Sequence, residues 1–169
     1  ETELLESSSV LTVHNSGYKG NVPGRFSNSL DIYDKFIVPE IFEDHGQLNL
    51  LKGGISFADQ VNTVSQGYAE ELKTPLGSHG LHEIYADKGN AFSGILNGCD
   101  YEEWNPESDP SLPECFSIND LAGKKVCKQK LQQTFGLPES SEVAVIGMVS
   151  RLPWQKGFEC LIPALQDIL

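Results

Sequence analysis

The sequence predicts an α/β protein built on a parallel β-sheet, and three observations support this fold class. Short apolar runs of strand length alternate along the chain with longer segments that carry apolar residues at helical spacing. One run, residues 143–149, is almost wholly apolar, as strands buried on both faces of a parallel sheet are. The chain has 169 residues, 39% hydrophobic and 21% charged, which favours a folded domain over a disordered chain.

The strands are predicted from apolar, β-branched runs that stop at polar or turn-forming residues. These runs are residues 10–13, 61–64, 92–96 and 143–149. Open parallel sheets bind their ligands at the carboxyl ends of the strands. The polar residues that follow the four runs are therefore candidate site residues: His14, Ser65, Asn97 and Arg151.

The helices are predicted between and after these strands. Their expected ranges are 30–42, 48–58, 66–72, 78–85, 118–135 and 157–169. We expect Ser65 to cap the third of them, because a serine hydroxyl can accept a hydrogen bond from a free amide of the first turn. Gly136 is expected to end the fifth helix. Residues 138–142 are expected to form a linker.

The chain is acidic, with 24 Asp and Glu residues against 12 Lys and Arg residues and a formal net charge of −12. This charge argues against general binding of nucleic acid or of anionic membranes. The four cysteines and four histidines lack metal-site spacing, so we expect no metal, and scattered thiols suit a reducing compartment. No apolar run is long enough to span a bilayer, and the acidic N-terminus is unlike a signal or transit peptide.

Two cations follow the last predicted strand. Residues 145–157 read VIGMVSRLPWQKG, so Arg151 and Lys156 lie just before the helix expected at 157–169. Free amide groups and partial positive charge at a helix N-terminus, together with two cationic side chains, favour binding of a phosphate group. On spacing alone, a solvated cationic loop is the alternative.

Two further segments accompany this motif. Residues 10–20 read VLTVHNSGYKG, and residues 93–106 read SGILNGCDYEEWNP. The three segments, in this order, resemble bacterial glycogen synthases and plant starch synthases of glycosyltransferase family 5. The resemblance covers about residues 10–169. It implies a Rossmann-like parallel sheet within a two-domain GT-B glycosyltransferase.

The resemblance also implies roles near the sugar of the donor. Taken alone, a histidine after a strand can simply satisfy loop carbonyls, and an Asn-Gly pair is most often a turn. In the family, the residues that match His14 and Asn15 line the pocket of the donor glucose, and the match of Asn97 hydrogen-bonds a glucose hydroxyl. Such side chains suit sugar hydroxyls, which both donate and accept hydrogen bonds.

Arg151 and Lys156 match the family residues that bind the diphosphate of the donor, and Gln155 matches beside them. Their charges would stabilise the negative charge that builds on the leaving nucleoside diphosphate. The resemblance therefore gives His14, Arg151 and Lys156 as catalytic residues. All three are also expected to bind substrate, together with Asn15, Asn97 and Gln155.

The chain departs from the family pattern after His14. Ser16-Gly17 stands where an aliphatic residue and alanine are common, and Lys19 stands where glutamine is common. Ser65 and Tyr68 lie in a segment that follows the family pattern closely. Both are expected to belong to the scaffold, with an approach to the acceptor or donor as the alternative.

The family transfers glucose from a nucleotide sugar, usually ADP-glucose, to the non-reducing end of an α-1,4-glucan with retention and without a metal or other cofactor. Residues 1–137 would be the second half of the N-terminal domain, 138–142 a linker, and 143–169 the incomplete start of the C-terminal domain. The family's Lys-x-Gly-Gly loop and late glutamate motif have no match here. We therefore expect this stretch alone to be inactive, and residues 143–169 to be poorly stable.

Two alternatives to this reading stay open. One is a non-catalytic truncated paralogue, or a module that binds glucan or nucleotide. The other is a GT-B enzyme that uses UDP-glucose. The expected partners are ADP-glucose, an α-1,4-glucan and the remainder of the same polypeptide, without nucleic acid. The expected location is the cytoplasm of a bacterium, or the plastid (chloroplast or amyloplast) of a plant or alga.

Overall fold

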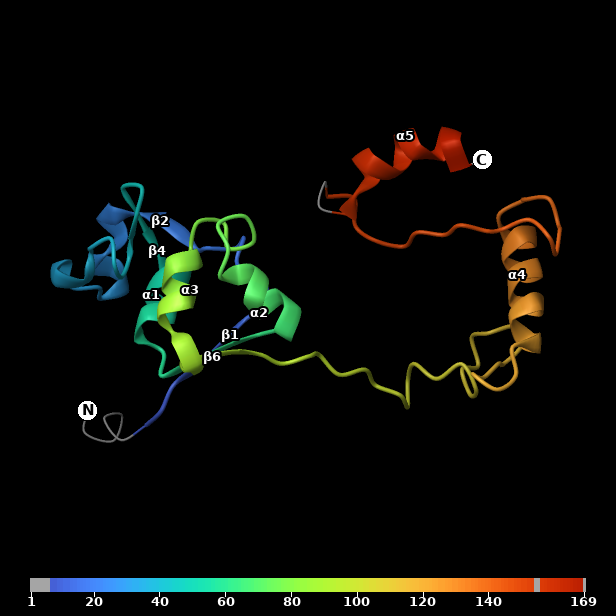
Figure 1. Ribbon diagram of the computed structural model, residues 1–169, viewed down its shortest axis with the longest axis horizontal. Helices are drawn as coiled ribbons and strands as arrows, with labels where there is room; N and C mark the ends of the chain where they lie inside the picture. Colours follow the sequence, from blue (N-terminus) through green and yellow to red (C-terminus); the bar gives the residue numbers. More distant parts are fainter. Residues whose placement is uncertain (1–6, 154–155, 169) are drawn as a thin grey trace. The chain divides into compact units, whose positions relative to one another are not determined.

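The computed structural model describes residues 7–153 and 156–168, and it divides into two compact units, Glu1–Gly98 and Cys99–Leu169. Over the described residues, the first unit holds two three-stranded sheets and three α-helices, and the second unit holds two α-helices (Figure 1). In neither described stretch does a helix combine the length and the apolar character that crossing a membrane requires.

The main sheet of the first unit is parallel, as predicted. Its strands lie in the order β1–β5–β6 and span Val10–Val13, Gln60–Thr63 and Phe92–Gly94. The register pairs Leu11 with Val61 and Val61 with Phe92. The connections between these strands contain helices, as crossovers between parallel strands require. The alternation of strand and helix read from the sequence is therefore confirmed for this unit.

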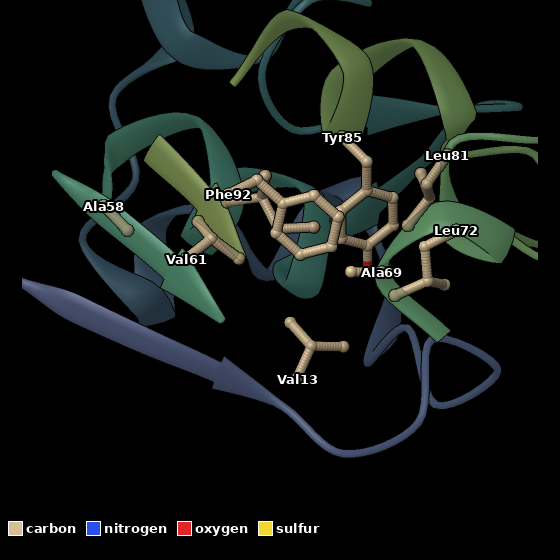
Figure 2. Close-up of a cluster of buried hydrophobic side chains, with 9 residues drawn as sticks. Val13, Ala58, Val61, Ala69, Leu72, Leu81, Tyr85 and Phe92 are labelled. Atoms are coloured by element: carbon tan, nitrogen blue, oxygen red, sulfur yellow. The ribbon is translucent and has the colours of Figure 1, made fainter. Parts of the chain in front are cut away.

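The helices of the first unit complete its core. They are α1, α2 and α3, which span Leu50–Phe57, Gln66–Leu72 and His82–Asp87. Apolar side chains from the strands and helices form one buried cluster (Figure 2): Val13, Ile55, Ala58, Val61, Ala69, Leu72, Leu81, Tyr85 and Phe92. Ser65 caps α2 as predicted, because its side chain accepts a hydrogen bond from the amide of Tyr68.

Two expectations for the first unit were wrong. Residues 30–42 do not form a helix but include short 3₁₀ turns, because Asp31 takes a left-handed backbone conformation and Pro39 cannot continue a helix. A second, antiparallel sheet in the order β2–β4–β3 was not foreseen. Its strands span Asn21–Pro23, Gln47–Asn49 and Glu43–Asp44, which is too short for a readable alternation of polar and apolar residues.

Several predicted elements begin or end at other residues than expected. The helix expected over 48–58 is α1 and begins only at Leu50, because residues 47–49 form β4. The helix expected over 78–85 begins only at His82, because His79 and Gly80 both have positive φ angles, which an α-helix excludes. The strand expected over 92–96 ends at Gly94, although the amide of Ile95 still bonds to the carbonyl of Thr63.

Gly94 gives a prediction about stability. A Cβ at this position would overlap the backbone carbonyl of Ser65, where α2 begins. Backbone cannot yield as a flexible side chain does, so Gly94→Ala must push the helix away from the sheet. We expect the free energy of unfolding to fall by about 2 kcal/mol or more, measured by urea unfolding followed by circular dichroism. Gly98→Ala, which meets nothing within 4 Å, is the control and should change it by less than about 1 kcal/mol. Equal effects of the two variants would contradict this packing.

The second unit contains the two helices expected in it. These are α4 and α5, which span Ala122–Thr134 and Phe158–Ile168, so the helix expected over 118–135 begins only at Ala122. Gly136 follows α4 with a positive φ of 64°, as predicted for a helix stop. The segment expected as a linker lies against α4: the side chains of Lys128 and Gln132 donate to the carbonyls of Ser141 and Ser140.

Residues 143–149 are not a strand, which corrects the sequence prediction. Over the described residues the second unit contains no strand, so this segment has no neighbour with which to form a hydrogen-bonded ladder. Most of its apolar side chains are accordingly exposed, with Val143 and Ile146 each about three-fifths accessible to solvent, while Val145 is half-buried. A run of this composition is a strand only where a sheet is present to receive it. The domain boundaries predicted at 137 and 143 stay predictions.

Candidate functional site

Three polar segments leave the main sheet at the same edge. Because β1, β5 and β6 run parallel, the residues that follow them emerge at the same edge. His14 directly follows β1, Ser65 lies two residues after β5, and Asn97 lies three residues after β6. The side chains of His14 and Asn97 are exposed and that of Asn15 is half-buried, so this edge presents hydrogen-bonding groups to a ligand.

The loop after β1 turns sharply at Asn15. The Asn15 side-chain oxygen accepts a hydrogen bond of 2.8 Å from the amide of Gly17, and the Asn15 carbonyl accepts one from the amide of Tyr18. A Cβ at Gly17 would stand 3.0 Å from that side-chain oxygen and 3.3 Å from Nε2 of His79. His79 therefore lies beside this loop. Sequence reasoning missed it, because a lone histidine in a loop carries no local signal.

Ser16 anchors this loop in the protein. Its amide donates to the Tyr68 hydroxyl at 3.1 Å, and its own hydroxyl donates to the carbonyl of Ser78 at 3.2 Å. The hydroxyl of Tyr85 donates to Oγ of Ser16 at 3.0 Å. Ser16, Ser78 and Tyr85 are each 0% exposed. Sequence reasoning missed these contacts too. The hydroxyls of Tyr68 and Ser65 both have partners within the scaffold, which is the role first expected for them.

The Tyr85 hydroxyl makes the stability of the chain sensitive to alkaline pH. Burial raises the pKa of Tyr85 from its ordinary value of 10.0 to about 12. Because the folded-state pKa lies above the unfolded-state value, this contribution to stability is complete below pH 10 and is lost as the pH rises toward 12.

We therefore expect the thermal unfolding midpoint of the chain to fall between pH 10 and pH 12, and Tyr85→Phe to fall less steeply over the same range. Circular dichroism melts at steps of half a pH unit measure both slopes. Tyr101→Phe removes a phenol that is 76% exposed, so it is the matched control and should keep the wild-type slope. A Tyr85→Phe slope equal to the wild-type slope would contradict the account.

The far end of the same loop is tied to the antiparallel sheet. Nζ of Lys19 lies 3.2 Å from Oδ2 of Asp44, and the Asn49 side chain donates to the same oxygen at 2.9 Å. Partial burial acts to raise the pKa of Asp44. The hydrogen bonds from Asn49 and Lys19 outweigh it and hold that pKa below its usual value. The positive charge of Lys19 is therefore paired with the carboxylate of Asp44.

The cationic residues belong to the second unit. Arg151 and Lys156 are both exposed, and Lys156 lies two residues before α5 begins at Phe158. The amide of Lys156 donates to the carbonyl of Pro153 at 3.0 Å, a hydrogen bond that does not involve the lysine side chain. Gln155 lies outside the described residues. The candidate residues for the sugar and for the diphosphate are thus described in separate units.

The chain is similar to known proteins along most of its length. The family described as starch synthase catalytic domain matches residues 1–87. Glycogen synthase 1 of Geobacter metallireducens is 46% identical over 160 residues, which are 95% of this chain and 32% of that protein. The glycogen synthase of Aliivibrio fischeri is 43% identical over 167 residues, or 97% of this chain and 34% of that protein.

A solved structure is also similar to the chain. It is the catalytic domain of starch synthase IV from Arabidopsis thaliana bound to ADP and acarbose, with a TM-score of 0.83 and 33% identity over 98% of this chain and 35% of that one. The chain therefore spans about a third of the length of the relatives that it matches.

Proposed function

This chain belongs to the starch synthase catalytic domain family, and from that membership we propose that it is part of a retaining glucosyltransferase, a glycogen or starch synthase. The proposed reaction transfers glucose from ADP-glucose to the non-reducing end of an α-1,4-glucan. The observation that carries the proposal is the loop of His14 and Asn15. It stands at the carboxyl edge of a parallel sheet and is held there by buried hydrogen bonds.

The choice of donor has its own support. The starch synthase IV structure, which matches 98% of this chain, is bound to ADP. In this chain, Arg151 and Lys156 are exposed cations that precede a helix of eleven residues, and such a helix start favours a phosphate group. We assign the diphosphate of ADP-glucose to these two side chains and to Gln155.

The proposed chemistry needs charge stabilisation and orientation. The bond between C1 of the donor glucose and the diphosphate oxygen breaks, and its electron pair leaves with ADP. The 4-hydroxyl oxygen of the acceptor forms the new bond to C1 on the face that the diphosphate leaves, which retains the configuration, and its proton passes to the departing diphosphate oxygen. Arg151 and Lys156 would stabilise the charge that develops on the departing diphosphate. Such a contribution is typically worth about 3 kcal/mol for one donor. His14, Asn15 and Asn97 would orient the glucose through its hydroxyls.

The donor assignment is tested by initial rates of glucose transfer to glycogen, measured on the complete gene product with ADP-glucose or UDP-glucose. We expect ADP-glucose to be used at least about tenfold faster, a difference of about 1.4 kcal/mol in transition-state binding. Faster transfer from UDP-glucose would show that the assignment of ADP-glucose as donor is wrong, while the assignment as a glucosyltransferase would stand. Transfer from neither donor by a folded protein would overturn the proposed function in favour of a binding module.

A further inference from the structure

We propose that Ser16 is a positioning residue of the donor site, whose buried amide and hydroxyl hold His14 and Asn15 in the geometry that binds the donor glucose. The proposal rests on the proposed function, because it assigns Ser16 to the same site. Ser16 does not touch substrate in this account. It acts through the loop that it fixes.

Three separate parts of the chain hold Ser16. The acceptor of its amide, Tyr68, lies on α2, and the donor to its hydroxyl, Tyr85, lies on α3. The carbonyl that its hydroxyl bonds belongs to Ser78, in the connection between those helices. Because Ser16, Ser78 and Tyr85 are fully buried, the loop cannot leave without exposing unpaired polar groups to an apolar interior.

The hydrogen bonds that fix Ser16 also restrict the candidate binding residues His14 and Asn15. The amide of Gly17 donates to the side-chain oxygen of Asn15, so the position of residue 17 sets the orientation of the Asn15 amide group. Only Asn15 separates His14 from Ser16 in the sequence, and His14 directly follows β1. The strand thus fixes His14 from one side and Ser16 fixes it from the other.

The hydrogen bond between Ser16 and Tyr85 depends on both side chains. An aliphatic side chain at position 16 would leave the buried Tyr85 hydroxyl without the acceptor that it has. The Tyr85 ring itself lies in the core beside Phe92, with ring centroids 5.0 Å apart, so its place does not depend on the hydroxyl (Figure 2). Removing that hydroxyl therefore loosens the loop and leaves the core filled.

The test is a double-mutant cycle in the complete gene product. Ser16→Ala and Tyr85→Phe each remove one side of the shared hydrogen bond. We expect each to lower kcat for transfer from the donor about tenfold, because small displacements of orienting groups cost that much or more. Ser16→Ala also removes the hydrogen bond from the Ser16 hydroxyl to the carbonyl of Ser78, so the double variant should lose little more than Ser16→Ala alone, because the hydrogen bond shared with Tyr85 is already gone.

Ile55→Val is the matched control for lost stability. Ile55 is fully buried in the same core, and trimming it lowers the unfolding midpoint without removing a hydrogen bond. We expect its kcat to stay within about twofold of wild type at a temperature where every variant is folded. Wild-type kcat in folded Tyr85→Phe, or losses that multiply in the double variant, would overturn the proposal.

Amide hydrogen exchange in the 169-residue chain separates this proposal from the proposed function. Loosening the loop should speed exchange of the Ser16 and Gly17 amides in Tyr85→Phe about tenfold, with the amides of β5 unchanged. This readout does not depend on glucosyl transfer. If the wild-type protein transfers no glucose, the proposed function fails while the exchange result still decides whether Ser16 holds the loop. Unchanged exchange at both amides would overturn the positioning role.

Discussion

Replacing Arg151 or Lys156 by alanine is expected to lower the turnover of the complete gene product at least about 100-fold with ADP-glucose. Each change would remove a full positive charge from the site assigned to the diphosphate. Both side chains are exposed, and the hydrogen bond from the amide of Lys156 to Pro153 survives truncation of the side chain. The unfolding midpoint should therefore change little. Initial rates and circular dichroism melts of the same preparations measure both quantities.

Lys130→Ala is the matched control for this prediction. Lys130 is an exposed lysine on α4, so its removal changes the net charge by the same amount outside the proposed site. We expect its turnover to stay within about twofold of wild type. Wild-type turnover in both Arg151→Ala and Lys156→Ala would show that these cations do not serve the diphosphate.

The second large effect is expected at the sugar end of the donor. His14→Ala should lower kcat/KM for ADP-glucose about 30-fold or more. Without the imidazole assigned to a glucose hydroxyl, the glucose is no longer held in the orientation that reacts. Binding of ADP should stay within about threefold of wild type, since the diphosphate is assigned to Arg151 and Lys156. Initial rates measure the first quantity and isothermal titration calorimetry the second.

His45→Ala is the control histidine, because the His45 side chain is 96% exposed and lies beside Asp44 rather than at the carboxyl edge of the main sheet. Its kcat/KM should match wild type. If His14→Ala weakened ADP binding and glucose transfer equally, the loop would have collapsed and the specific role of His14 would be wrong.

Local sequence patterns correctly predicted those elements of the first unit whose structure depends mainly on their own residues. The apolar runs near residues 10, 61 and 92 became parallel strands, and Ser65 capped α2. The family inferred from three short motifs is confirmed by the family match to residues 1–87 and by glycogen synthases that are 46% and 43% identical over 95% and 97% of the chain. The prediction failed at residues 143–149, where the apolar run was read as a strand. Strand formation depends on a neighbouring strand, and over the described residues the second unit offers none.

The candidate site shows the same division. His14, Asn15 and Asn97 were found from the resemblance, and the parallel sheet places the segments that carry them at one edge. The anchor of their loop could not be read from sequence, because the partners of Ser16 lie 52, 62 and 69 residues away along the chain. A serine after a strand carries no local sign of such contacts. The roles assigned to the binding residues stay predictions that the variants above test.

We propose above all that this chain belongs to an enzyme that adds glucose to a glucan. The most direct measurement is the incorporation of labelled glucose from ADP-glucose into glycogen by the complete gene product. An exo-acting amylase that releases sugars from non-reducing ends then locates the label. We expect the wild-type protein to incorporate label that the amylase releases, and Arg151→Ala to incorporate almost none. No incorporation by the folded wild-type protein, or label that the amylase cannot release, would contradict the proposal.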